Sequence, residues 1–598
     1  MRSHHDIRRD VTTPITGPAG NSQQTLSNLR PNGEFIRKAL ISWILGDHQA
    51  LQQVESSRFK QFLAAILPLQ SSSLLPTRQT LRRWVLDTFD EHRVTISARL
   101  SAARSHVHIS FDGWTSPNHK SFLGIVAHWT DEKYKVCSAL IGLKELQYTH
   151  DGTNLATIVM NVLQNYGIIE KIGYFMCDNA SNMTTAIEEI SRQLFALGNT
   201  ILNSSERRLR CWGHAVNLSA KDVLGGRGRI NDSALAIGDP NSIEEERAAF
   251  VHWCQNLAVD KLLGFTVFVN ASPARRNLFI SVQQDHLHQL KAWIIRRMTS
   301  TRWGSAHDMI HDGLRLRDAI DIFLGVLAAQ QPQKRDEILS HQLTTTEWDE
   351  LQKIHDLLSP LKEVSSLMEG NIVGPGGYHG NGALCDVLPG FDHLLNHFER
   401  AKTQLMESGD THLATCVNLA WSKLDKYYQY TDDSAVYLVA TVLDPRLKFG
   451  YFEKAWAKKP EWLRTAKQRL YKYDSFIITT DCRYRDDYAT LMVVDPLPES
   501  IAIQPSNPRH SEFLVWKYGR PAITSASDEL DKYLGAERET QLDLDVHAWW
   551  MQHQKQYPLL FRMAMDIMAI PAMASEVERV FSRHILSLTI LTIIVQSC

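Results

Sequence analysis

The sequence lacks several features that would place a protein in a class at once. The net charge of its 598 residues is −2, so no overall positive field indicates nucleic acid, and DNA contacts have to come from local basic patches. Cysteines are few and show no paired spacing, which predicts reduced thiols in a cytosolic or nuclear compartment. They are Cys137, Cys177, Cys211, Cys254, Cys385, Cys416, Cys482 and Cys598.

Long apolar runs are also missing. Residues 1–33 are polar and rich in Ser, Thr, Pro, Asn and Gly, so they do not resemble a signal peptide and are expected to form a disordered leader. The most membrane-like run, 585–595, contains Ser and Thr and is well short of the roughly 20 residues that cross a bilayer. We therefore expect no membrane partner.

What is present is an ordinary globular composition, 44% hydrophobic and 22% charged, over a length that predicts two or three domains. Apolar residues at helical spacing predict a small all-α region over 34–104. Strand patterns come next, because apolar residues alternate with polar ones or form short runs. The predicted elements are strands over 107–112, 122–129 and 134–143, a helix over 153–166, and a strand over 172–177 that is apolar on both faces.

Three antiparallel strands, a helix and then a central strand form the order of a ribonuclease H-like core. We therefore expect an α/β fold whose first part occupies 105–224. Helical periodicity dominates over 225–545, and so much helix next to an α/β core predicts an inserted all-α domain. The final helices, 546–582, should complete the core before an apolar tail over 583–598. Loops are expected near 225–244 and 481–525.

Three acidic residues are candidates for one site. Asp112 ends the first predicted strand, Asp178 follows the central strand, and Glu578 lies on the last amphipathic helix. Phosphoryl transfer with two metal ions needs hard oxygen ligands that converge on Mg²⁺ or Mn²⁺. We interpret the three acids as a DDE-type nucleotidyl-transfer site, which requires an insertion between the last helix and the sheet.

Each acid also has a purely structural interpretation. Asp112 belongs to an Asp-Gly pair, which is a common turn dipeptide. Asp178 can form an Asx-turn or cap the helix after it. Ser575 and Glu578 have the spacing of a capping box. The position of both aspartates at adjacent strand ends favours the site over these local roles.

Several ordered motifs resemble those of hAT-superfamily DNA transposases, and of fungal members most of all, over about residues 35–582. The motifs are FDGWTS at 111–116, CDNASNM at 177–183, CWGHAVNL at 211–218, TRW at 301–303, DELDKYL at 528–534, Trp549-Trp550, and IPAM at 570–573 running into SEVERVFS at 575–582. The last of these resembles the family's C-terminal dimerisation signature.

The resemblance implies a ribonuclease H-like catalytic core split by a helical insertion domain. Asp112, Asp178 and Glu578 match the family's catalytic triad, which implies a site for two Mg²⁺ or Mn²⁺ ions. The implied partners are transposon ends, target DNA and further copies of the chain in a homodimer or larger homo-oligomer, and the implied compartment is the nucleus. The implied chemistry is hydrolysis at the element's end, hairpin formation on flanking DNA, and strand transfer.

Other matched positions are candidate DNA contacts. Cys211 and His214 match the family's C-x-x-H motif. They are two ligands where a structural zinc needs four, so we assign them to local structure or to the positioning of DNA ends, and His214 also fits an ordinary packed histidine. Trp303, beside Arg302, matches an insertion-domain tryptophan that stacks on a flipped base, although a buried core tryptophan fits the sequence equally.

Basic residues add further candidates for phosphate contacts. They are Arg207, Arg208 and Arg210 before the Cys211 motif, and the pairs Arg275-Arg276 and Arg296-Arg297. Any one such group is more often a solvated helix face.

The chain departs from the family pattern at both ends. The first cysteine is Cys137, so the BED-type zinc finger with which family members commonly begin is expected to be missing. After Ser582 an apolar tail replaces the family's charged segment, which resembles a truncated or misjoined end. Three hypotheses follow: a hAT transposase, a catalytically inactive DNA-binding or dimerisation protein derived from one, and a ribonuclease H-like nuclease that acts on another nucleic acid.

Overall fold

A computed structural model provides the structure of the chain, and it places most of the expected elements. The residues that it describes are 33–47, 49–66, 75–116, 119–146, 151–199, 203–225, 257–288, 290–299, 303–369, 383–480, 526–541 and 543–584. The predicted leader (to residue 32), most of the predicted loop at 225–244, the loop at 481–525 and the tail from 585 lie outside these residues. The chain divides into two compact units between Phe89 and Asp90.

The first unit is helical. It contains α1 (Gly33–Gly46), α2 (Ser57–Ile66) and the first half of α4 (Arg78–Ser101), which continues into the second unit. Trp43 of α1 stacks on Phe59 of α2 with the ring centroids 4.8 Å apart. The helices agree with the spacing of apolar residues over 34–104.

A mixed five-stranded sheet forms the centre of the second unit. Its strands lie in the order β3-β2-β1-β4-β5, with β1 antiparallel to β2 and parallel to β4. The bounds are β1 (Val107–Thr115), β2 (Ser121–Thr130), β3 (Val136–Leu146), β4 (Ile172–Cys177) and β5 (Arg208–Arg210). The first four match the predicted strands to within a few residues, whereas β5 was not predicted.

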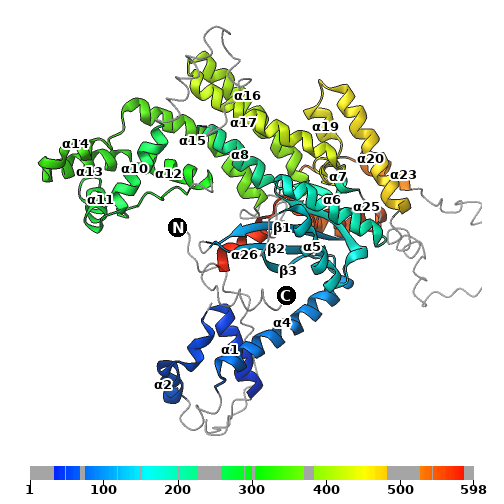
Figure 1. Cartoon of the computed structure of the whole chain (residues 1–598). Helices are drawn as coiled ribbons and strands as arrows, with labels where there is room; N and C mark the ends of the chain where they lie inside the picture. Colours follow the sequence, from blue (N-terminus) through cyan, green and yellow to red (C-terminus); the bar gives the residue numbers. More distant parts are fainter. Residues whose placement is uncertain are drawn as a thin grey trace, which may run out of the picture. The chain divides into compact units, whose positions relative to one another are not determined.

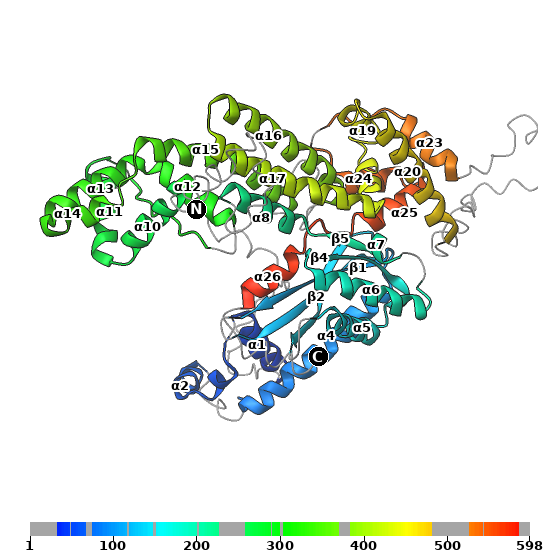
Figure 2. The ribbon, with the colours of Figure 1, turned by 45° about the horizontal axis from the view of Figure 1, so that its top comes forward.

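Helices cover both faces of this sheet (Figure 2). On one face, α5 (Gly152–Tyr166) and α6 (Ser181–Ala196) pack against a cluster of apolar side chains that includes Ile109 and Phe175. On the other face, α8 (Trp212–Val223) belongs to a second cluster. Every residue of β4 is buried, as expected for a central strand with both faces covered.

After α8 the chain is helical, and the described residues from 257 to 480 contain no strand (Figure 1). The helices are α10 (Ala258–Asn270), α11 (Pro273–Asp285), α12 (Trp303–Arg315), α13 (Arg317–Gln330), α14 (Arg335–Leu339), α15 (Thr345–Met368), α16 (Val387–Glu407), α17 (Thr411–Gln429), α18 (Val436–Val442), α19 (Gly450–Ala455) and α20 (Pro460–Thr480). Short 3₁₀ turns lie at Pro332–Lys334, Leu384–Asp386 and Tyr430–Asp433. None of the described helices combines the length and the apolar composition needed to cross a bilayer.

The last described helices bring the chain back to the sheet. They are α23 (Ala526–Gly535), α24 (Val546–His553), α25 (Pro558–Ile567) and α26 (Ser575–His584). The Trp212 amide donates to the Ala572 carbonyl at 3.2 Å, so the segment between α25 and α26 lies beside the start of α8. Helix α26 packs against β1 and β2.

Candidate active site

Asp112 lies inside β1, not in a turn. It pairs with Gly124 of β2, and its Oδ1 accepts a hydrogen bond of 2.8 Å from the Gly113 amide. The hairpin that joins the two strands comes later, where the Ser116 amide donates to the Lys120 carbonyl. The turn interpretation of Asp112 is therefore wrong, and its half-buried side chain is set at a fixed place along the strand.

Asp178 lies level with Asp112 on the neighbouring strand. Ser110 of β1 pairs with Met176 of the parallel strand β4, and each aspartate is two residues further on. Carboxyl ends of parallel strands share one edge of a sheet, where α/β proteins gather their functional groups. Asp178 also makes the Asx-turn that the sequence allowed, because its Oδ1 accepts from the Ala180 amide at 3.1 Å.

Glu578 comes from α26, on the far side of the long helical region. The helix begins at Ser575, and the Ala574 carbonyl accepts from the amides of Val577 and Glu578. Ala574 itself is held beside α8, because its amide donates to Cys211 Sγ at 3.4 Å. Val577 is fully buried while Glu578 is exposed, so the helix packs on the sheet and leaves the carboxylate accessible.

The charges of Asp178 and Glu578 act on Asp112. Burial first, and then the charges of Asp178 and Glu578, raise the pKa of Asp112 to about 7. Like charges disfavour ionisation of one another only over a short range. The structure therefore brings the three predicted residues to one edge of the sheet, while their catalytic role stays a prediction.

Two of the arginines predicted to bind DNA have internal roles instead. Arg207 is fully buried, and its guanidinium donates to the carbonyls of Ile172 and Gly173. Arg208 is 5% exposed and donates to the carbonyls of Asp178 and Ala180. These side chains are engaged by the backbone around β4, so the predicted phosphate contacts are wrong for both. Arg208 instead fixes the loop that presents Asp178.

Arg210 is more accessible than Arg207 and Arg208. Its guanidinium lies over the Tyr430 ring at 4.6 Å from the centroid and 3.7 Å from Asp433. Burial lowers the pKa of Arg210, and the nearby Arg208 lowers it further, with Asp433 among the groups that oppose this. A phosphate contact by Arg210 stays a prediction.

The C-x-x-H motif lies next to the acids. Burial, with smaller contributions from the charges of Glu578 and Asp112, raises the pKa of Cys211 to about 12, so the thiol is neutral at ordinary pH. Burial lowers the pKa of His214 and outweighs the opposing charge of Asp178. A neutral imidazole beside Asp178 is consistent with local structure or DNA-end positioning, and the role of His214 stays a prediction.

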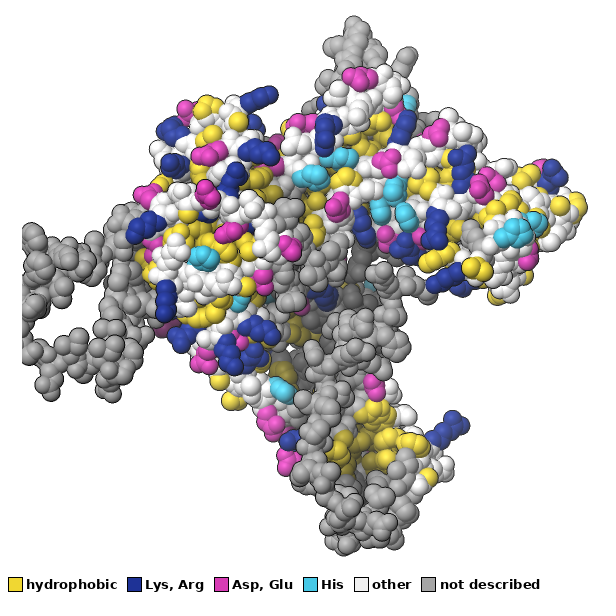
Figure 3. Space-filling model, turned by 180° about the vertical axis from the view of Figure 1, so that it is seen from behind, with side chains coloured by type: hydrophobic (Ala, Val, Ile, Leu, Met, Phe, Trp, Pro, Cys, Tyr) yellow, Lys and Arg dark blue, Asp and Glu magenta, His cyan; other side chains and the backbone are white. Residues whose placement is uncertain are grey.

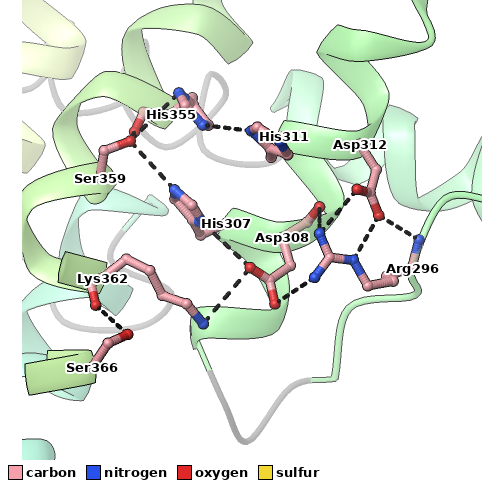
Figure 4. A network of polar contacts seen from close by, with 9 residues as sticks. All are labelled: Arg296, His307, Asp308, His311, Asp312, His355, Ser359, Lys362 and Ser366. Atoms are coloured by element: carbon pink, nitrogen blue, oxygen red, sulfur yellow. Dashed lines mark hydrogen bonds and ion pairs between the residues drawn. The ribbon is translucent and has the colours of Figure 1, made fainter. Parts of the chain in front are cut away.

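Trp303 begins α12 and is partly buried against the core, while Arg302 lies outside the described residues. A polar network fixes this helix (Figure 4). Arg296 pairs with Asp312 at 2.7 Å and with Asp308 at 3.1 Å, and Lys362 of α15 lies 3.7 Å from Asp308. The network engages Arg296, another candidate phosphate contact, in ion pairs. Base stacking by Trp303 stays a prediction.

A buried charge cluster that was not predicted joins the sheet to the returning segment. Asp566 of α25 accepts from the His106 amide at 2.6 Å, and its Oδ2 lies 2.8 Å from His106 Nδ1. His108 Nε2 lies 3.1 Å from the Asp566 carbonyl oxygen. Burial alone would raise the pKa of Asp566, but the charges and hydrogen bonds of the two histidines hold it well below its usual value. The signal in the sequence was an acid within the apolar run Met563–Ile567.

The donor atoms of the site fit magnesium or manganese. Both ions prefer carboxylate oxygens, and a divalent charge offsets the repulsion among the three acids. In the described parts of the chain, no three His, Cys, Asp or Glu side chains already stand in metal-binding positions. Metal binding by the three acids therefore stays a prediction.

Two family models match the parts of the chain that carry these acids. A ZBED1 RNase-like domain matches residues 110–206, and a hAT family C-terminal dimerisation region matches residues 529–592. The chain is similar to hAT-family proteins in both regions. The first match contains both aspartates, and the second contains Glu578.

Curated relatives agree with these matches. The chain is 25% identical to the putative transcriptional regulator tpeD of Talaromyces stipitatus, over 91% of this chain and 58% of that protein. It is 22% identical to the putative AC transposase of Zea mays, over 88% of this chain and 59% of that protein. It is 21% identical to the zinc finger BED domain-containing protein DAYSLEEPER of Arabidopsis thaliana, over 95% of this chain and 73% of that protein. The chain thus spans about three fifths of the length of the first two relatives.

Proposed function

We propose that this hAT relative acts on DNA as a transposase or a transposase-derived enzyme, with a ribonuclease H-like core interrupted by an all-α insertion. The observation that carries the proposal is the meeting of Asp112, Asp178 and Glu578 at one edge of the sheet. The helices between residues 258 and 535 separate the last acid from the first two along the chain. Such an arrangement is what an insertion into a catalytic core produces.

The substrate class follows from the donor set and from the relatives. Bound Mg²⁺ or Mn²⁺ would supply the charge that activates an attacking water or 3′-hydroxyl and stabilises the leaving oxygen. Asp112 and Asp178 are the ligands from the sheet, and Glu578 is the ligand from the helix. The proposed steps are cleavage at the element's end, hairpin formation on flanking DNA and strand transfer.

The surrounding residues hold this edge of the sheet in place. Arg208 fixes the Asp178 loop through two backbone carbonyls, and Cys211 fixes the start of α26 through the Ala574 amide. Burial raises the pKa of the Cys211 thiol, so it stays neutral and adds no charge to a crowded acidic site. Further proposals are a homodimer or larger homo-oligomer formed through the region matched at 529–592, and a nuclear location.

A test uses the purified chain with Mg²⁺ or Mn²⁺ and duplex DNA taken from the inverted repeats that flank its gene. Cleavage at the repeat ends is expected, and Asp112→Asn should lower its rate by about 100-fold or more. Loss of a residue that only hydrogen-bonds a metal ligand already lowers activity by about 10–100-fold, and Asp112 is proposed to bind the metal itself. Folded protein that binds these ends without cutting them favours a second candidate, a non-catalytic DNA-binding protein. The name of the fungal relative, a putative transcriptional regulator, supports that candidate.

A further inference from the structure

The segment from Lys454 to Lys472 is unusually basic for a chain of net charge −2. It contains seven Lys or Arg residues, with Lys454 and Lys472 at its ends included, and one acidic residue, Glu461. The segment covers the last two residues of α19, the turn after it and the first part of α20, and the exposed acid Glu453 precedes it in α19. We name its exposed basic side chains the α19–α20 strip. They are Lys454, Lys458, Lys459, Arg464, Lys467 and Lys472.

Helix α20 has two distinct faces. Ala466, Leu470 and Tyr473 are buried, at spacings of three and four residues. Arg464, Lys467 and Lys472 are exposed. From Arg464 to Lys472 the helix rises by about 12 Å, which matches three or four base steps of one DNA strand. Figure 3 shows Lys and Arg side chains over the lobe that holds α19 and α20, at the left of this rear view, with Asp and Glu side chains among them.

Most of this charge is not neutralised. Arg464 pairs with Glu461 at 2.6 Å on the same helix, and Arg469 pairs with Asp432 at 2.9 Å. The other lysines make no ion pair with any residue in the described parts of the chain. These unpaired lysines are Lys454, Lys458, Lys467 and Lys472. The strip therefore presents a net positive charge to solvent.

An exposed tryptophan holds one cation of the strip. Lys459 Nζ lies 3.7 Å from the centroid of the Trp462 ring, and Trp462 is 45% exposed. The edge of Trp462 packs on Trp456, with the ring centroids 5.6 Å apart, and the indole nitrogen of Trp456 donates to the Tyr428 hydroxyl. A cation fixed on an aromatic ring loses less conformational entropy when it binds an anion.

The strip has a fixed position relative to the proposed active site. The hydroxyls of Tyr473 in α20 and Tyr174 in β4 form a buried hydrogen bond of 2.9 Å. Tyr174 lies four residues before Asp178, or about 13 Å along the strand. Helix α20, which would hold the anion, is therefore joined by this hydrogen bond to β4, the strand that leads to Asp178.

We propose that the α19–α20 strip is a second DNA-binding surface, which holds the phosphate backbone of a duplex away from the three acids. Charge complementarity selects a polyanion, and lysines from the end of α19, the turn and the exposed side of α20 supply contacts that do not depend on base sequence. The choice of DNA among polyanions rests on the proposed function. The binding itself needs neither metal nor catalysis.

The test compares two variants with equal loss of charge. The strip variant replaces Lys454, Lys458, Lys467 and Lys472 by Gln. The matched control replaces exposed basic residues elsewhere, Lys133, Lys135, Lys334 and Arg335, by Gln. Binding of a fluorescein-labelled duplex of arbitrary sequence is measured by anisotropy in EDTA at several salt concentrations. Circular dichroism and Tm show that both variants are folded.

The strip variant should bind the duplex about tenfold or more weakly than the wild type at moderate salt. Its log–log salt slope should be smaller by about one for each phosphate that the variant no longer neutralises. The control should bind like the wild type. Equal binding of the duplex by both variants would overturn the proposal that the strip binds DNA. The proposal would also be overturned if polyglutamate displaced the labelled duplex as well as unlabelled DNA of matched charge does. If the strip variant binds the duplex weakly and the wild type does not cut its repeat ends, the DNA-binding surface is supported and the proposed function fails.

Discussion

His106 Nδ1 lies 2.8 Å from Asp566 Oδ2, although the two residues are 460 positions apart in the chain. This buried contact joins the start of β1, which carries Asp112, to the end of α25, which leads to Glu578. A contact at this point sets where the last helix rejoins the sheet. The contact therefore helps to hold the C-terminal segment beside β1.

Replacement of the Asp566 carboxylate should destabilise the fold. Asp566→Asn exchanges one acceptor oxygen for an amide donor, and leaving a buried donor of His106 without an acceptor costs about 1–3 kcal/mol in the free energy of unfolding. Urea unfolding at neutral pH measures the change. The control is Asp349→Asn at an exposed position of α15, for which a change within about 0.5 kcal/mol is expected. Equal stability of the two variants would contradict a structural role for Asp566.

The raised pKa of Asp112 predicts how stability depends on pH without metal. In the unfolded chain the group ionises near its ordinary value of 3.8, and in the folded protein near 7. Stability therefore falls as the pH rises from about 4 through about 7, because the folded state has to lose a proton that it holds more tightly. At pH 8 in EDTA, Asp112→Asn should be more stable than the wild type by about 2 kcal/mol, with allowance for partial exposure.

Added Mg²⁺ should reverse this penalty. Protons and the metal compete for the same carboxylates, so the rise in Tm on adding Mg²⁺ should be larger at pH 8 than at pH 6. The Asp112→Asn variant should show little of this rise. A Tm that does not respond to metal at either pH would argue against a metal site at these acids.

Two glutamates on α26 allow the loss of a proposed metal ligand to be compared with the loss of a nearby carboxylate on the same helix. Glu578→Gln should lower cleavage of the repeat ends by about 100-fold or more, because it removes a proposed metal ligand. Glu576→Gln is the matched control, since Glu576 pairs with Arg579 at 2.9 Å on the same helix. Rates of strand cleavage at saturating Mg²⁺ measure both. A similar loss in the two variants would indicate damage to the helix and not loss of a ligand.

Arg208 should act as a positioning residue for the Asp178 loop. Arg208→Lys keeps the charge but loses the planar set of donors that reaches the carbonyls of Asp178 and Ala180. We expect about a tenfold weaker apparent affinity for Mg²⁺ in the cleavage assay, with cleavage restored at high Mg²⁺. Arg192→Lys, at an exposed ion pair with Glu189, is the control. Loss of activity that high Mg²⁺ does not restore would contradict this role.

Local patterns in the sequence predicted much of the sheet and the first two acids. Strands β1 and β4 carry clear alternation or a continuous apolar run, so the ends that present Asp112 and Asp178 could be placed. Strand β5 is only three residues long, too short for any periodic pattern, and it was missed. The assignment of Glu578 depended on the motif around it, because no local pattern reports a partner several hundred residues away.

Long-range contacts explain the remaining errors. Arg207 and Arg208 look like surface cations in the sequence, but the fold surrounds them with backbone carbonyls of β4 and the loop after it. Asp566 and His106 are ordinary residues until the chain brings them together. Such pairs depend on tertiary structure, and neither composition nor spacing carries that information.

The central claim is that three distant segments share one metal site, and Fe²⁺ in place of Mg²⁺ tests it directly. Fe²⁺ with ascorbate and peroxide cuts the backbone close to where the ion binds, and mass spectrometry locates the cuts. The account predicts cuts near Asp112, Asp178 and Glu578 together, all suppressed by excess Mg²⁺ and all lost in Asp112→Asn. Cuts near the two aspartates alone, with residues 575–582 intact, would contradict it.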